Sequence, residues 1–263
     1  MAALPAGSLR GLFRYRALVG NLVAKDLKLK YRDSLLGLFW SLLHPALMLI
    51  TYVFAFKVVL RVRAENYPYF VMAGLLPWTF FASALTASTQ AIVGNAGLIR
   101  KVYFPREILP LASVLFAFTQ LLLALAVFLP ALILISGIGV SWKMALVLPV
   151  LLLHLAFTLG LAFPLAAVTV HLRDVAHLTE VMLPILFWVT PIVYPIDMVP
   201  ATLQGWMKLS PLALFALTYQ DVLFRARLPE WELIAPVIGW SAATVGVGYL
   251  VFRRFSPTLA EDV

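Results

Sequence analysis

Charged residues are absent from long stretches of this 263-residue chain, and their absence constrains the fold more than any other feature. A helix needs about 20 mostly apolar residues to cross the hydrocarbon core of a bilayer. Six charge-free stretches of 16 or more residues occur, at 34–56, 66–99, 108–142, 144–172, 181–196 and 233–252. Hydrophobic residues make up 63% of the chain and charged residues only 12%. A water-soluble domain is therefore excluded, and the chain is predicted to be a multi-pass membrane protein.

These stretches predict an all-α membrane protein with six transmembrane helices. The expected spans lie at about 35–58, 69–93, 108–136, 144–170, 176–195 and 233–252, so that 35–252 forms the transmembrane domain. The fifth charge-free stretch is short, but it extends backward through Glu180. Two smaller apolar pieces, 198–207 and 209–220, are too short to cross and are expected as re-entrant or interfacial helices. Residues 253–263 are expected to form a tail.

Residues 1–34 are predicted to contain an amphipathic helix that lies in the membrane interface. Apolar and polar side chains alternate there at helical spacing on opposite faces. The alternative is a helix packed on a soluble partner. Charges recur up to Asp33, so the segment is not a signal peptide. The apolar face comprises Tyr15, Leu18, Val19, Leu22, Val23 and Leu27, and the polar face Arg14, Asn21, Lys25, Lys28 and Arg32.

Basic residues indicate the orientation of the chain. Its net charge is +8, and basic residues flank both the first and the last expected span. Six spans place both termini on one side, and the excess of Lys and Arg there marks that side as cytoplasmic. On this topology 13 Lys and Arg lie inside and 7 outside. We therefore expect a multi-pass protein of the cytoplasmic (inner) membrane with both termini in the cytoplasm.

Several kinds of chemistry are excluded by the residues that are missing. No Cys is present, which excludes thiol catalysis, Cys-ligated zinc and iron–sulfur clusters. No Gly is followed by Lys, so the chain has no Walker A loop for ATP. The four His do not form a metal-ligand spacing, and we predict neither catalytic residues nor a metal site. The His residues are His44, His154, His171 and His177.

Ion-coupled transport is also disfavoured, because the interiors of the spans lack acidic residues. His154 in the fourth expected span is the exception. It is either a functional group, the usual expectation for an intramembrane His, or a neutral imidazole hydrogen-bonded to a neighbouring helix.

Four segments carry a family resemblance. They are 25–54, which begins KDLKLKYRDS; the run NAGLIRKVYFPRE within 66–115; LRDV followed by TPIVYP within 171–195; and the tail YLVFRRFSPTLAEDV. Together they resemble the permease subunit of a type-2 ABC exporter, and most closely the branch that exports O-antigen and teichoic-acid polysaccharides. The resemblance covers nearly the whole chain.

The resemblance implies a function and partners. Such permeases form homodimers and bind two copies of a separate ABC ATPase subunit, which carries the ATP and magnesium, so this chain is expected to hold no cofactor. The implied substrate is a glycan linked to undecaprenyl pyrophosphate, which is moved outward across the cytoplasmic membrane. Membrane lipid is the other partner, and no nucleic acid is expected. The short pieces between spans five and six become gate helices by the same resemblance.

The resemblance also implies a coupling helix in the loop 94–107, which docks on the ATPase. Gly94 and Gly97 are expected to break span two, and 98–103 to form a short helix. A second loop, 171–177, offers Arg173 and Asp174. The alternative for Arg100, Lys101 and Arg106 in the first loop is that they anchor it at the membrane. The alternative for the second loop is that Arg173 and Asp174 pair with each other. The candidate coupling residues are Leu98, Arg100, Lys101, Tyr103, Arg106, Arg173 and Asp174.

Two further sites are candidates. A pyrophosphate headgroup needs several cationic donors at the membrane surface. We assign it to Lys25, Lys28, Lys30 and Arg32 beside the turn at Gly37, with bulk anionic lipid as the alternative ligand.

The second candidate site is the channel, since sugar faces stack on aromatic rings and aromatics make up 13% of the chain. Spans one and five line the pore in the family, which favours Tyr52, Phe187, Trp188 and Tyr194. The alternative is lipid-facing rings and interface belts.

Two other functions compete with this interpretation. One is a type-2 ABC permease for a drug or a lipid. The other is a membrane-embedded transferase, which needs a polar catalytic cluster at one interface. The paired acids are Glu230 and Glu232 beside Trp231, which are expected in a solvated loop, and Glu261 and Asp262 in the tail.

Overall fold

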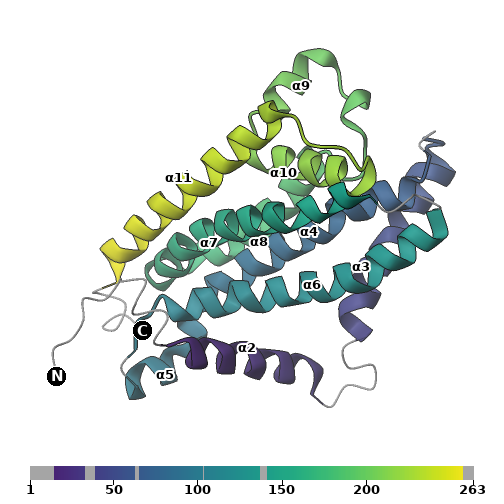
Figure 1. Ribbon diagram of the computed structural model, residues 1–263. Coiled ribbons are helices and arrows are strands. Elements are labelled where there is room, and N and C mark those ends of the chain that lie inside the picture. The colour runs from purple at the N-terminus through teal and green to yellow at the C-terminus, as the bar shows by residue number, and fades with distance from the viewer. Residues whose placement is uncertain (1–14, 33–38, 63–64, 103, 137–140, 257–263) are drawn as a thin grey trace.

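The protein is described by a computed structural model over residues 15–32, 39–62, 65–102, 104–136 and 141–256. These residues form helices joined by turns and contain no strand, which confirms the all-helical prediction. The longest helices run side by side as one bundle (Figure 1). The principal helices are α2 (Arg16–Tyr31), α3 (Trp40–Tyr52), α4 (Tyr67–Thr89), α5 (Ala96–Lys101), α6 (Ile108–Ser136), α7 (Val147–His171), α8 (Asp174–Val189), α9 (Ala201–Met207), α10 (Pro211–Tyr219) and α11 (Trp231–Phe255).

Five helical segments in the described chain are long and apolar enough to cross a membrane. The first joins most of α3 to the π-helix η2 (Val53–Val59), and the fourth joins the 3-10 helix η4 (Trp142–Leu146) to α7. The protein is therefore a multi-pass membrane protein. The five segments are Leu42–Val59, Tyr67–Thr89, Ile108–Ala131, Trp142–His171 and Trp231–Phe255.

Helix α8, the expected fifth span, is shorter than these segments. It has 16 residues and ends at Val189, whereas the expected span reached residue 195. Thr190 adopts an extended conformation (ψ 134°) because the residue before a proline is disfavoured in the α region, and Pro191 follows it. The chain beyond α8 is therefore not helical until the short 3-10 helix η5 (Ile196–Met198).

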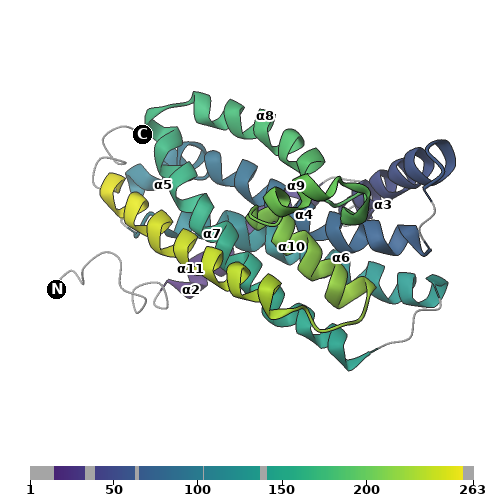
Figure 2. The ribbon, with the colours of Figure 1, turned by 90° about the horizontal axis from the view of Figure 1, so that it is seen from above.

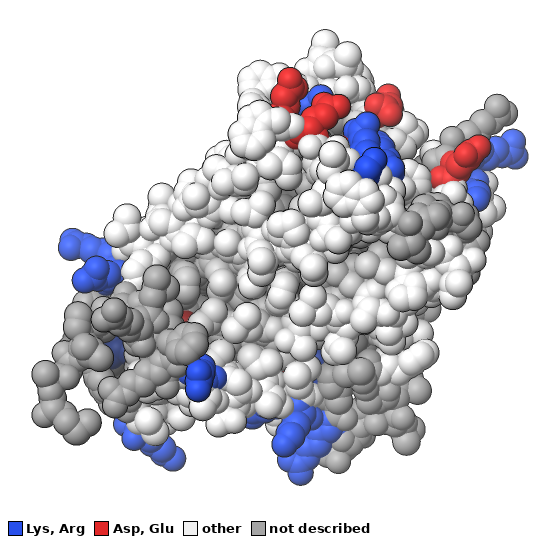
Figure 3. Space-filling model, in the orientation of Figure 1, with Lys and Arg blue, Asp and Glu red and all other residues white. Residues whose placement is uncertain are grey.

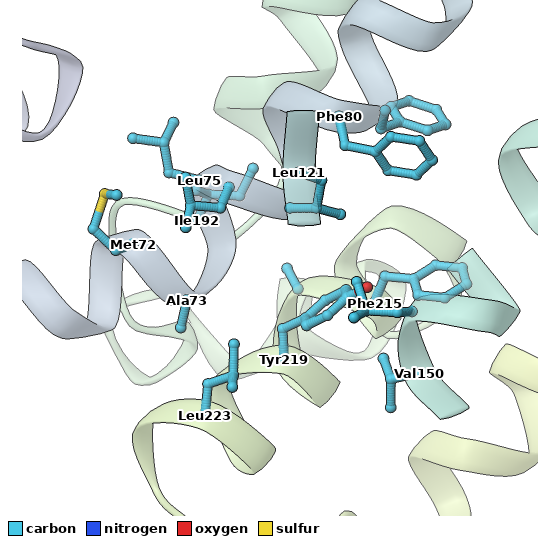
Figure 4. Packing of buried hydrophobic residues seen from close by; sticks show 14 of the residues in the cluster. Met72, Ala73, Leu75, Phe80, Leu121, Val150, Ile192, Phe215, Tyr219 and Leu223 are labelled. Carbon is cyan, nitrogen blue, oxygen red and sulfur yellow. The ribbon is translucent and has the colours of Figure 1, made fainter. Parts of the chain in front are cut away.

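Helix α4 lies at the centre of the bundle, between α8 on one edge and α11 on the other (Figure 2). Asn66 precedes it in the left-handed conformation (φ 50°), and Pro68 occupies its first turn. Most of its residues are buried, which is unusual for a helix in a bilayer and reflects packing on several neighbours. Figure 4 shows Met72, Leu75 and Phe80 of α4 in the same buried cluster as Phe215 and Tyr219 of α10.

Helix α2 packs on the protein with the apolar face that the sequence predicts. Val19 and Leu22 are buried against Ile108 at the start of α6 and Phe252 near the end of α11. Asn21, Lys25, Lys28 and Arg32 of its polar face are exposed. Since α2 runs along α6, its apolar face covers another helix of the same chain and is not left open for a soluble partner (Figure 1).

The bundle has two ends of different charge. Helix α5, the start of α6 and the end of α11 lie together at one end, which we call the basic end (left in Figure 1). In Figure 3, Lys and Arg predominate there and along α2, whereas Asp and Glu gather with other basic residues at the opposite, mixed-charge end near α9. This asymmetry has the form that membrane proteins use to set their orientation.

The segment between α8 and α11 lies at the mixed-charge end (Figure 1). Helix α9 is exposed there, and the side chains of Leu203 and Trp206 face outward. By contrast, residues 213–219 of α10 are all buried, and the helix continues as the π-helix η6 (Gln220–Phe224). The two short helices expected between the last spans therefore differ: one is superficial, and one is packed into the bundle.

Candidate functional site

Three of the four candidate channel residues come together where α3 meets α8. The ring of Tyr52 stacks on Phe187, with centroids 5.5 Å apart, and meets the edge of Trp188 at 6.3 Å. Phe187 is itself buried against Trp78 of α4, whereas Trp188 is 54% exposed. Trp188 therefore presents a free aromatic face, and Phe187 supports it from behind.

The fourth candidate, Tyr194, caps helix α8. Its hydroxyl donates to the carbonyls of Trp188 at 2.9 Å and Val189 at 3.2 Å, two of the carbonyls that the helix end leaves without helical partners. Tyr194, expected from the sequence as a ring in the path, thus also makes a local contact that ends helix α8.

The non-helical segment after α8 is held by two buried hydrogen bonds. Tyr67 at the start of α4 donates to the carbonyl of Val193 at 2.5 Å. The amide of Gln220 donates to the carbonyl of Pro191 at 2.7 Å. Both carbonyls are freed by the break in the helix, and backbone freed at membrane depth is tolerated only when protein or water satisfies it. The segment is thus anchored to α4 and to η6.

A buried carboxylate that the sequence analysis missed holds the end of η6. Asp221 is fully buried and contacts Arg225 at 2.6 Å and Arg227 at 2.9 Å. Its hydrogen bond raises the pKa of the Arg227 guanidinium above the usual value. The sequence signal that could have identified this site is an acid, Asp221, followed within six residues by Arg225 and Arg227.

The expected coupling loop forms a helix, with shifted bounds. Helix α4 ends at Thr89, a 3-10 turn η3 (Val93–Asn95) follows, and α5 spans Ala96–Lys101, where 98–103 was expected. Leu98 is partly buried in the cluster that also holds α2, whereas Arg100 and Lys101 are exposed at the basic end. Tyr103 lies outside the described residues. This short exposed helix between two spans is a surface to which another protein can bind.

The other coupling candidates have different surroundings. Arg106 donates to the carbonyl of Ser256 and so joins the start of α6 to the end of α11. Arg173 and Asp174 begin α8, and among the ion pairs described at this turn the contact is between His177 and Glu180, at 3.8 Å. Mutual pairing of Arg173 with Asp174, one of the two interpretations, is not present there.

The structure divides the candidate headgroup cluster. Lys25 lies 3.7 Å from the carboxylate of Asp26, and Lys28 and Arg32 are exposed on α2. Lys30 instead turns toward α6, where its ammonium donates to the side-chain oxygen of Gln120 and lies 5.7 Å from the centre of the Phe116 ring. Gly37 lies outside the described residues.

His154, the intramembrane His, is enclosed by aromatic rings. Phe215 stacks on it with centroids 4.6 Å apart, and Phe80 meets it edge-on at 5.2 Å. Its Nδ1 lies 3.4 Å from the hydroxyl of Tyr219 on α10. This arrangement matches the second interpretation, a buried imidazole hydrogen-bonded to a neighbouring helix. The part of the chain that the structure describes contains no group of three His, Asp or Glu side chains placed to hold a metal.

Taken together, the bundle of apolar helices, the exposed short helix at its basic end and the aromatic face along α3 and α8 are those of a multi-pass membrane protein. Residues 17–224 match the model of the ABC-2 type transporter family, and the chain belongs to this family.

Its relatives are transport permeases. The chain is 33% identical over 256 residues to an O-antigen export system permease protein, RfbA, of Myxococcus xanthus, with 97% of this chain and 98% of the relative covered. It is 31% identical to an RfbA permease of Klebsiella pneumoniae, with 90% and 91% covered. A polysialic acid transport protein, KpsM, of Escherichia coli is 20% identical, with 89% and 92% covered.

Proposed function

We propose that this protein is the permease subunit of an ATP-driven exporter that moves a lipid-linked polysaccharide of the O-antigen type across the cytoplasmic membrane. The observation that carries this proposal is the 33% identity to an O-antigen export permease over nearly the full length of both chains. The aromatic face formed by Tyr52 and Trp188 supports it, since sugar rings bind to exposed aromatic surfaces.

The proposed topology has six spans, with α8 as the fifth. At about 1.5 Å per residue the 16 residues of α8 extend about 24 Å, and the extended segment that follows adds the remaining length. The basic end faces the cytoplasm together with both termini, because cytoplasmic segments of membrane proteins carry the excess of Lys and Arg. The mixed-charge end then faces outward, with α9 and α10 as gate helices.

The proposed assembly is a homodimer that binds two ABC ATPase subunits at its basic end. The chain has no Walker A loop, so ATP and magnesium belong to the partner. Helix α5 is the docking element, because Arg100 and Lys101 are exposed at its tip. Arg173 and Asp174 form a second contact at the same end.

The proposed path begins at α2 and ends beside α8. Lys25, Lys28 and Arg32 attract the pyrophosphate of the undecaprenyl-linked glycan to α2, since opposite charges at a membrane surface associate. The glycan then passes along Trp188, and the segment after α8, which contains Tyr194, lies at the exit.

Deletion of the gene in the source cell, with complementation by the wild-type gene, tests this function. We expect glycan linked to undecaprenyl pyrophosphate to accumulate in the cytoplasmic leaflet and the corresponding surface polysaccharide to be lost. Mass spectrometry of extracted lipids and labelling of the cell surface measure the two. An unchanged surface polysaccharide with no accumulated lipid-linked glycan would contradict the proposal.

A further inference from the structure

A polar crevice opens between the end of α2, the start of α3 and the middle of α4 and α6. Its volume is about 260 Å³, and its floor consists of apolar side chains that include Phe80 and Leu121, both labelled in Figure 4. The polar and aromatic lining, unlike the apolar surfaces around it, brings together side chains from all four helices. They are Lys30, Trp40, His44, Thr79, Ser83 and Gln120.

The crevice reaches deep into the bundle. Gln120 is the thirteenth residue of α6, about 18 Å from the start of that helix at 1.5 Å per residue. Thr79 lies ten residues before the end of α4, about 15 Å from the same end of the bundle. Both side chains therefore lie near the middle of their own membrane-spanning helices.

Polar groups on membrane-spanning helices need a partner or a polar cavity. Most hydroxyls on the spans bond to their own helix, as Thr79 does with the carbonyl of Leu76 at 2.8 Å. Ser83 and His44 differ: both side chains are exposed, and neither has a hydrogen-bond partner among the residues that the structure describes. Their polar atoms are therefore available to a ligand in the crevice.

The charge of the crevice selects the ligand. Its described lining contains a cation, Lys30, and no acidic side chain. The hydrogen bond to Gln120 holds the ammonium at the crevice. An ammonium together with an amide, a hydroxyl and an imidazole supplies the donors that bind phosphate oxygens.

The ring of Trp40 lies at the same crevice and is half exposed. Such a ring offers an apolar face with one polar edge, which suits a group that is neither fully charged nor fully apolar. A sugar joined to a phosphate has this character.

We propose that this crevice binds the phosphate and first sugar of the exported lipid while that lipid crosses the membrane. Lys30 and Gln120 hold the phosphate, Ser83 and His44 donate to the oxygens around it, and Trp40 lies against the sugar. A resident phospholipid is the other source of such a phosphate, and the phosphatidylglycerol probe below distinguishes the two. The choice of the exported lipid as the source of that phosphate rests on the proposed function.

Binding to the full permease, assembled with its ATPase in nanodiscs of phosphatidylcholine, tests the proposal without an export assay. The probes are a short polyprenyl pyrophosphate with one N-acetylglucosamine, the same pyrophosphate without the sugar, and phosphatidylglycerol. We expect Lys30→Met and Gln120→Leu each to weaken binding of the sugar-bearing probe by about tenfold. The double variant should lose little more, because the two side chains share one contact.

Matched variants separate the site from general effects. Gln90→Leu makes the same change at the exposed end of α4 and should leave binding within about twofold of the wild type. Ser83→Ala removes one hydroxyl from the crevice and replaces Gln120→Leu as the test variant if Gln120→Leu does not fold. Trp40→Leu should weaken binding of the sugar-bearing probe more than binding of the sugar-free probe.

Two results would overturn the proposal. One is unchanged binding of both pyrophosphate probes in Lys30→Met, Gln120→Leu and Ser83→Ala. The other is that these variants lose binding of phosphatidylglycerol to the same extent as binding of the pyrophosphate probes, which would make the crevice a site for any anionic lipid. Failure of the proposed function has a separate signature: the crevice variants weaken probe binding, while the gene deletion leaves the surface polysaccharide unchanged.

Discussion

Gly248 of α11 faces the backbone carbonyl of Gly160 in α7 so closely that a Cβ atom added to Gly248 would lie 1.8 Å from that oxygen. A Cβ on Gly160 would in turn lie 2.3 Å from the backbone of Thr244. Small residues allow membrane helices to approach at the backbone, where dispersion contacts replace the hydrophobic effect that lipid cannot supply. The hydroxyl of Ser241, which donates to the carbonyl of Leu153 at 3.0 Å, adds a polar contact at the same helix pair.

The first prediction concerns this helix crossing. Gly248→Ala should destabilise the protein by about 2 kcal/mol or more, because the methyl group meets backbone that cannot move aside without separating the helices. The thermal unfolding midpoint of the purified protein in detergent measures the effect. Gly246→Ala and Gly239→Ala, on the same helix with open space around them, should leave the midpoint unchanged or raise it. An equal fall of the unfolding midpoint in all three variants would disprove the close packing of α7 and α11 as the cause.

The second prediction concerns the buried carboxylate at the mixed-charge end. Asp221→Asn removes both ion pairs while leaving the volume unchanged, and should cost about 2 kcal/mol, reduced from the value for a fully buried pair because Arg225 and Arg227 are partly exposed. The unfolding midpoint should fall accordingly. Asp197→Asn, an exposed acid near by, is the matched control and should have little effect.

The third prediction separates two neighbouring rings of α8. Trp188→Ala should slow export of long glycans with little loss of stability, because this ring is exposed. Phe187→Ala should lower the unfolding midpoint, at a cost of about 3 kcal/mol, because its ring packs between Tyr52 and Trp78. Chain-length profiles of the surface polysaccharide and thermal melts test the pair. Normal export of long chains by Trp188→Ala would remove this ring from the path.

The fourth prediction concerns coupling to the ATPase. Reversal of charge in the double variant Arg100→Glu, Lys101→Glu should uncouple ATP hydrolysis from export and weaken copurification of the ATPase subunit, because opposite charges at the contact become like charges. Arg253→Glu, Arg254→Glu reverses two charges at the same end of the bundle outside the coupling loop and is the control. Normal export by the α5 variant would show that these residues only anchor the loop.

The sequence by itself determined the class of protein and most of its helices. Charge-free stretches of membrane length are a local property, since each apolar residue in lipid contributes to insertion regardless of its neighbours. Four of the six expected spans correspond to single helices long enough to cross, and the first to α3 continued by η2. The apolar face of α2 was likewise legible, because its residues recur at helical spacing.

Only the tertiary structure decided where polar groups meet. Gln120 and Ser83 are unremarkable polar residues within apolar stretches, and their shared crevice arises because α2 and α3 fold over α4 and α6. In the same way, helical spacing leaves Lys30 off the polar face that holds Lys25, Lys28 and Arg32, but only the structure shows that it meets Gln120 of α6. Hydropathy reports how each residue partitions into lipid, whereas contacts between side chains distant in sequence depend on how helices pack, which no local pattern encodes.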